Sequence, residues 1–85
     1  MYELQFDTKA IEFLNKTEQK VKERIFRKIL TAKKEPFRYF TRLTNRTEYK
    51  LRVGHYRIIA DIDTKTKVIK IRLIMHRKNV YKRHI

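Results

Sequence analysis

The sequence predicts an α+β fold in which two amphipathic helices pack on one face of a sheet that ends in a three-stranded antiparallel meander. Two observations predict it. The hydrophobic period is close to 3.6 residues after position 8, and it switches to two from position 49 onward. A short alternating stretch precedes the helices, so the order is strand, helix, helix, meander. Amphipathic helices need an apolar surface, and one face of a sheet supplies it.

The N-terminal elements follow from alternation and from capping residues. Residues 2–6 alternate between apolar and polar, which predicts a short strand. Asp7 or Thr8 can cap the helix that follows, and its inner face is expected to carry Ala10, Ile11 and Leu14. Thr17 starts a longer helix that Pro36 ends. Its expected apolar stripe consists of Val21, Ile25, Phe26, Ile29, Leu30 and Ala32.

The meander begins after an irregular segment at 37–46. Gly54-His55 separates two alternating runs, and a Gly-X pair suits a two-residue type II′ hairpin. That turn pairs Arg52 with Arg57. If residues 63–66 form a four-residue loop, Ile62 pairs with Lys67 and Arg57 falls opposite Arg72. Alternation then puts Ile69, Ile71, Leu73 and Met75 on the core face of the last strand, and Lys70, Arg72, Ile74 and His76 on the other face.

Charge is the second strong signal of this chain. A formal net charge of +14 on 85 residues implies an anionic partner, with nucleic acid the first candidate, an acidic protein the second and a membrane surface the third. The length suits one domain, 1–85. Cysteine is absent, and no run approaches the roughly 20 apolar residues of a membrane span. We therefore expect a cytoplasmic protein that is not bound to a membrane.

The expected register aligns three arginines on the outer face, and this arrangement predicts an anion-binding site. Like charges directly opposite one another destabilise a sheet, so folding alone gives little reason to align Arg52, Arg57 and Arg72. The ending adds His76, Arg77 and Tyr81, which supply an imidazole, a guanidinium and a phenol. Only Glu48 and Asp61 are acids near this region, so neither a metal nor another cofactor is expected.

Metal-free cleavage of RNA fits this set of residues, because the 2′-OH of RNA supplies the nucleophile. Such an enzyme needs a base, an acid and positive charge for the transition state. A weak set of catalytic groups suffices if a larger partner arranges the substrate.

These residues resemble the RelE/ParE toxin superfamily over nearly the full length of the chain. The resemblance rests on the element order, on the hairpin from Tyr49 to Arg57 with its Gly-X-Tyr-Arg, and on the ending from Met75 to Tyr81 with its His-Arg and following Tyr. In the RelE branch it implies a toxin of a type II toxin–antitoxin system: a ribosome-dependent endoribonuclease that cuts mRNA in the ribosomal A site and is neutralised by a RelB-like antitoxin.

The resemblance also implies roles for individual residues. Arg57 would contact the scissile phosphate, Arg77 would stabilise the leaving group or transition state, and Tyr81 would stack on the codon. Either Glu48 or His76 would be the general base. Lys50 and Arg52 match basic positions of the family. Together with the distribution of charge, this predicts six RNA-binding residues: Lys50, Arg52, Lys70, Arg72, Lys78 and Lys82. The ParE branch, which shares the fold and inhibits DNA gyrase, stays as an alternative, as does a basic nucleic-acid-binding module without catalysis.

Overall fold

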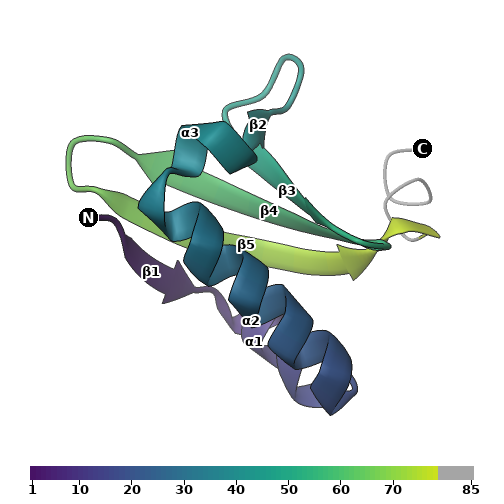
Figure 1. The fold of residues 1–85 in the computed structure, drawn as a ribbon. Helices are drawn as coiled ribbons and strands as arrows, with labels where there is room; N and C mark the ends of the chain where they lie inside the picture. The colour runs from purple at the N-terminus through teal and green to yellow at the C-terminus, as the bar shows by residue number, and fades with distance from the viewer. Residues whose placement is uncertain (79–85) are drawn as a thin grey trace.

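In the computed structural model, which describes residues 1–78, one mixed sheet of five strands carries helices α1 and α2 across one of its faces (Figure 1). The strand order is β1-β5-β4-β3-β2, with β1 parallel to β5 and the remaining neighbours antiparallel. The elements are β1 (Glu3–Phe6), α1 (Thr8–Lys16), α2 (Gln19–Lys34), α3 (Pro36–Tyr39), β2 (Thr41–Arg42), β3 (Tyr49–Val53), β4 (Tyr56–Asp63) and β5 (Val68–His76).

The predicted fold class is confirmed, and the sheet is wider than the predicted meander. The N-terminal strand joins the meander as β1, because it pairs along β5 from Glu3↔Val68 to Phe6↔Ile71. The segment expected to be irregular contains α3 and β2. Pro36 separates α2 from α3 and occupies the first turn of α3, where its missing N–H costs nothing.

Helix α1 begins at the predicted cap, but one of the side chains that face the core differs from the prediction. The Asp7 carboxylate accepts a hydrogen bond from the Thr8 N–H at 3.0 Å. Ala10 and Leu14 are buried, and Phe13 is half-buried against the same core. Ile11 is 45% exposed, so its predicted place on the inner face is wrong. Each residue advances the helix by about 100°, and Phe13 takes the place that Ile11 was expected to fill.

Helix α2 buries most of its predicted stripe. Ile25, Ile29 and Ala32 are fully buried. Phe26 packs its ring 5.6 Å from the ring of Phe6. Leu30 is 51% exposed, which corrects its predicted core position. The stripe is therefore narrower than the sequence pattern suggests.

The first turn of the meander has the predicted register, with Arg52↔Arg57 next to the turn. Gly54 has a φ of 57° and His55 is not among the residues with positive φ, as a type II′ turn requires. The second turn differs from the prediction, because Ile62 pairs with Ile69 and Arg57 pairs with Met75.

Two local features set the register of the second turn. The Asp63 carboxylate accepts hydrogen bonds from the backbone N–H groups of Lys65 at 2.9 Å and Thr66 at 3.2 Å. Lys67 then adopts a φ of 56° and closes the turn, so β5 begins one residue later than expected.

A β-bulge in β5 reverses the predicted faces of its second half. Pairing shifts between Ala60↔Ile71 and Ile59↔Leu73, which leaves Arg72 without a partner in register. Such an extra residue moves every later side chain to the opposite face. Ile74 therefore enters the core and is 4% exposed, and Met75 becomes the cross-strand partner of Arg57 on the open face, where it is buried at 9% exposure.

Candidate functional site

The open face of the sheet, which α1 and α2 leave uncovered, carries a cluster of cations toward the end near Gly54. We call this cluster, made of Lys50, Arg52 and Arg57, the arginine face. Arg52 and Arg57 are cross-strand partners, which sets their Cβ atoms about 5 Å apart. Arg52 is exposed and Arg57 is half-buried. No ion pair involving either guanidinium forms among residues 1–78, so no carboxylate in this part of the chain compensates the two like charges.

A hollow of about 220 Å³ opens beside this pair. From the described part of the chain, three cations and no carboxylate line it: its walls are Tyr39, Thr41, Lys50, Leu51, Arg52 and Arg57. The concave shape and the single sign of charge attract an anion of the size of a phosphate. Tyr39 and Thr41 come from the segment predicted to be irregular. Only the structure identifies them, because neither belongs to a periodic pattern.

Glu48 lies on the open face next to the arginine face. It lines a shallow hollow of about 190 Å³ together with Ile59, Leu73 and Arg72. The pairs Lys50↔Ile59 and Ile59↔Leu73 show that these residues share the face that carries Arg57. Glu48 is thus the predicted base that the fold places on the same side of the sheet as the paired arginines.

Arg72 does not extend the row of arginines, and this prediction is wrong. Its guanidinium donates to the Asp7 carboxylate at 3.0 Å and to the Asp61 carboxylate at 2.7 Å. The contacts with Asp61, and then those with Asp7, raise the pKa of Arg72. Lys70 is the cross-strand partner of Asp61 and lies beside Gln5, away from Arg57. The bulge therefore divides the predicted RNA-binding set into two groups.

His76 lies on the opposite face, since its cross-strand partner is Tyr56. The His76 ring is 5.2 Å from the Tyr56 ring and 6.0 Å from the His55 ring. Tyr56 in turn contacts Phe13 of α1 at 5.9 Å. The backbone N–H of Lys78 donates to His76 Nδ1 at 3.3 Å. The imidazole is thus placed in an aromatic cluster rather than beside Arg57.

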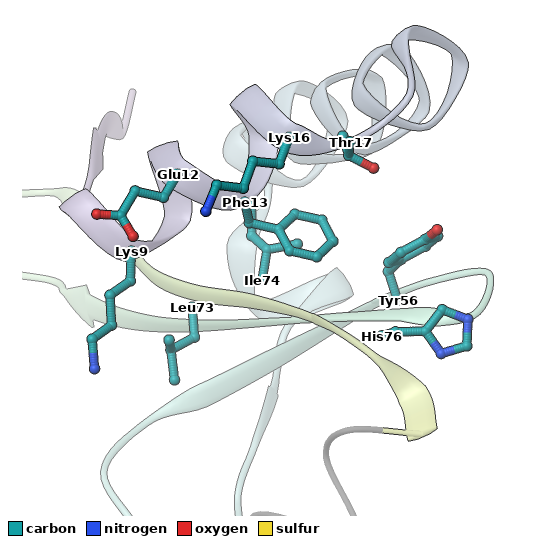
Figure 2. A pocket seen from close by; sticks show the side chains of 9 residues that line it. All are labelled: Lys9, Glu12, Phe13, Lys16, Thr17, Tyr56, Leu73, Ile74 and His76. Carbon is teal, nitrogen blue, oxygen red and sulfur yellow. The ribbon is translucent and has the colours of Figure 1, made fainter.

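A groove of about 530 Å³ runs along this cluster between α1 and the end of β5. We call it the aromatic groove and define it by Phe13, Tyr56, Ile74 and His76. Figure 2 shows Ile74 pointing toward Phe13, whereas Leu73 points away from α1. Lys9, Glu12, Lys16 and Thr17 line the rest of the groove.

Arg77 and Lys78 follow β5 and are both exposed. The Arg77 N–H donates to the His55 carbonyl at 2.6 Å, which holds the chain against the β3–β4 turn. Arg77 is therefore close to the end of the sheet that carries Arg52 and Arg57. Tyr81 and Lys82, the remaining predicted site residues, lie outside the described residues.

Within residues 1–78, no three His, Asp or Glu side chains gather in a way that could hold a metal ion. None of the helices there is long and apolar enough to cross a membrane.

The family comparison covers almost the whole chain. Residues 4–81 match the model of the ParE toxin of type II toxin–antitoxin systems. No curated protein matches the chain.

Solved structures share the fold at low sequence identity. A chain of a RelBE toxin–antitoxin complex from Mycobacterium tuberculosis superposes with a TM-score of 0.80 at 24% identity, covering 89% of this chain and 98% of that one. The RelE–RelB complex from Pyrococcus horikoshii gives 0.77 at 23% identity, with 89% and 94% covered. The isolated RelE toxin of Escherichia coli gives 0.74 at 19% identity, and both chains are covered completely. Taken with the family match, these likenesses identify the chain as a toxin of the ParE family of type II toxin–antitoxin systems, within the RelE/ParE superfamily.

Proposed function

We propose that this toxin is a RelE-type, ribosome-dependent endoribonuclease that cuts mRNA in the ribosomal A site. The observation that carries the proposal is the cross-strand pair Arg52–Arg57 beside a hollow whose lining has no carboxylate. Two adjacent guanidiniums without counter-charges suit a phosphodiester, because Arg binds phosphate oxygens in a bidentate manner.

The proposed chemistry uses the 2′-OH of RNA and needs neither metal nor cofactor. A base removes the 2′-OH proton, and the resulting oxygen attacks the adjacent phosphorus. The bond between phosphorus and the 5′-oxygen breaks, which leaves a 2′,3′-cyclic phosphate and a 5′-oxygen that takes up a proton from an acid or from water. Arg57 stabilises the charge that grows on the phosphate oxygens in the transition state. Glu48 is the favoured base because it shares the open face with Lys50 and Arg57, whereas His76 faces the helices.

The other site residues keep proposed roles that follow the resemblance. Arg77 would stabilise the leaving group, and its backbone contact with His55 supports this by holding it at the turn. Lys50, Arg52 and Lys78 would bind RNA. The stacking role of Tyr81 and the RNA contact of Lys82 stay predictions. Lys70 and Arg72 are less suited to binding RNA, since Arg72 is held by two carboxylates and Lys70 lies beside one of them.

The proposed partners are an antitoxin and the ribosome with its mRNA. Structures with this fold from four organisms are of complexes with RelB-type antitoxins. A RelB-like antitoxin with acidic residues would relieve the repulsion within a chain of net charge +14. Action on ribosomes implies that the toxin works in the cytoplasm.

Primer extension on a defined mRNA in a reconstituted translation reaction tests the proposal. We expect new cuts within the A-site codon, seen only with ribosomes, and lost when Arg57→Ala replaces the wild type. Arg72→Ala is the matched control, because it removes the same charge from a residue already engaged with Asp7 and Asp61. Intact mRNA in every lane, from protein shown to be folded, overturns the proposal.

A second candidate is inhibition of DNA gyrase, which the description of the matched family favours, since it names the ParE toxin. A supercoiling assay with purified gyrase separates the two, because only the gyrase inhibitor acts without ribosomes. If neither assay responds, a basic nucleic-acid-binding module without catalysis is the remaining reading.

A further inference from the structure

A second cationic hollow adjoins the arginine face on the side of α2. It has a volume of about 400 Å³, and its lining consists of Arg24, Arg27, Lys28, Thr31, Tyr39, Arg52, Val53 and Gly54. Tyr39 and Arg52 also line the hollow that contains Arg57. The two hollows therefore form one track, which leads from Arg57 on the open face, past the β3 edge at Arg52, to helix α2.

The cations of α2 are spaced to face this track together. Arg24, Arg27 and Lys28 stand at i, i+3 and i+4, which places them on one side of a helix. Residues 1–78 contribute four cations and no carboxylate to the lining. Within the same range, none of these four takes part in an ion pair. Their mutual repulsion destabilises the free protein, and an anionic ligand would relieve it.

Arg24 is held against the turn that carries the paired arginines. A Cβ added to Gly54 would lie 2.8 Å from a terminal guanidinium nitrogen of Arg24, which is too close for van der Waals contact. The missing side chain at Gly54 thus lets Arg24 lie directly on the β3–β4 turn. This contact joins the cations of α2 to those of β3 and β4.

Tyr39 separates the two hollows and positions a cation at their junction. The Nζ atom of Lys28 lies 5.0 Å from the centroid of the Tyr39 ring, within the range of a cation–π interaction. Because Tyr39 lines both hollows, Lys28 stands where a chain passing from one hollow to the other would cross.

We propose that this track binds the backbone of the RNA strand that flanks the scissile phosphate, with Arg24, Arg27 and Lys28 as phosphate contacts. The inference rests on the proposed function for the identity of the ligand. The lining favours RNA over an acidic protein, because a positively charged groove that also presents an aromatic ring is the arrangement that binds single strands. The track combines four cations with the ring of Tyr39.

The experiment is the salt dependence of binding of a fluorescent single-stranded oligouridylate, measured by anisotropy on the full chain without ribosomes. Each lost phosphate contact reduces the slope of log K against log salt by about 0.7. Arg24→Ala/Arg27→Ala should therefore reduce it by about 1.4. The matched control, Lys65→Ala/Lys67→Asn, removes the same charge from the other end of β4, roughly 25 Å away at about 3.3 Å per residue. Asn is chosen because Lys67 has a positive φ. The control should leave the slope unchanged.

The outcomes decide the proposal. Equal changes in both double variants overturn it, since they would mean that binding follows net charge alone. An unchanged slope in Arg24→Ala/Arg27→Ala overturns it as well. A polyglutamate peptide serves as a second probe, and a loss of its binding greater than the loss of RNA binding would assign the track to an acidic protein. Should the alanine variant unfold, Arg24→Gln/Arg27→Gln keeps the aliphatic stems and gives the same test. Because no ribosome is present, a nuclease that fails in translation leaves this result intact.

Discussion

The arginine face and the aromatic groove lie on opposite faces of the same strands, and residues that are adjacent in sequence contribute to the two sites. Arg57 and Tyr56 are adjacent in β4, and Met75 and His76 are adjacent in β5. Arg57 and the buried Met75 lie on the open face, whereas Tyr56 and His76 lie on the face that α1 covers. One side gathers charges that oppose folding, and the other gathers rings that favour it.

This difference separates residues that stabilise the fold from residues of the proposed site within a short stretch of sequence. The aromatic groove stabilises the fold by burying apolar side chains. Ile74, for example, is only 4% exposed. The arginine face contributes repulsion between cross-strand partners. Substitutions on the two sides should therefore have opposite signatures, and four predictions test this.

The largest effect is expected on cleavage, from the arginine face. Arg57→Ala should lower the rate of mRNA cleavage by about 100-fold or more, the size seen when a group that stabilises a developing charge is removed. The melting temperature should stay the same or rise, because a like-charge pair is lost. His76→Ala should lower cleavage by less than about tenfold, since a group that does not reach the phosphate contributes no proton transfer. Equal losses from the two variants would contradict the assignment of His76 to the aromatic groove.

The sequence could predict the arginine pair but not its separation from Arg72 and His76. Arg52↔Arg57 follows from Gly54-His55, because a two-residue turn leaves one choice of register. The bulge at Arg72 has no such local signal. The ion pairs of Arg72 with Asp7 of the α1 cap and Asp61 of β4 form only after the chain has folded.

The sequence also could not predict which apolar helix residues are exposed. Ile11 and Leu30 fit an apolar stripe in sequence, yet they are 45% and 51% exposed. Which edge of a wide stripe meets the sheet depends on how the helix lies on it. That orientation is set by contacts distant in sequence, such as the one between Phe6 and Phe26.

The next effect is on stability, from the core beneath the aromatic groove. Ile74→Ala should lower the free energy of unfolding by about 3 kcal/mol, as buried Ile-to-Ala changes do. Leu73→Ala should lower it less, because the bulge turns Leu73 toward the open face, where it is half-buried. Urea unfolding of both variants measures the difference. A larger loss of stability in Leu73→Ala than in Ile74→Ala would contradict the bulge and indicate that side chains alternate regularly along β5.

A smaller effect is expected at Arg72, which belongs to neither side. Arg72→Ala should lower the melting temperature slightly, because it leaves Asp7 and Asp61 without their guanidinium. Salt screens exposed ion pairs, so the difference from the wild type should shrink at high ionic strength. Thermal unfolding at low and high salt checks this. If Arg72→Ala loses mRNA cleavage as well as stability, Arg72 belongs to the same functional site as Arg52 and Arg57.

The smallest effect is expected at the turn that sets the register of β5, and it depends on pH. Hydrogen bonds from the backbone N–H groups of Thr66 and Lys65 lower the pKa of Asp63 below its ordinary value. A lowered pKa in the folded state stabilises the protein above the unfolded pKa of about 3.9. That contribution disappears as the pH falls through the folded value. The wild type should therefore be slightly more stable than Asp63→Ala near neutral pH, and the difference should vanish in acid. A difference that persists below the folded pKa would mean that Asp63 acts by packing rather than by charge, and that Lys67 alone closes the turn.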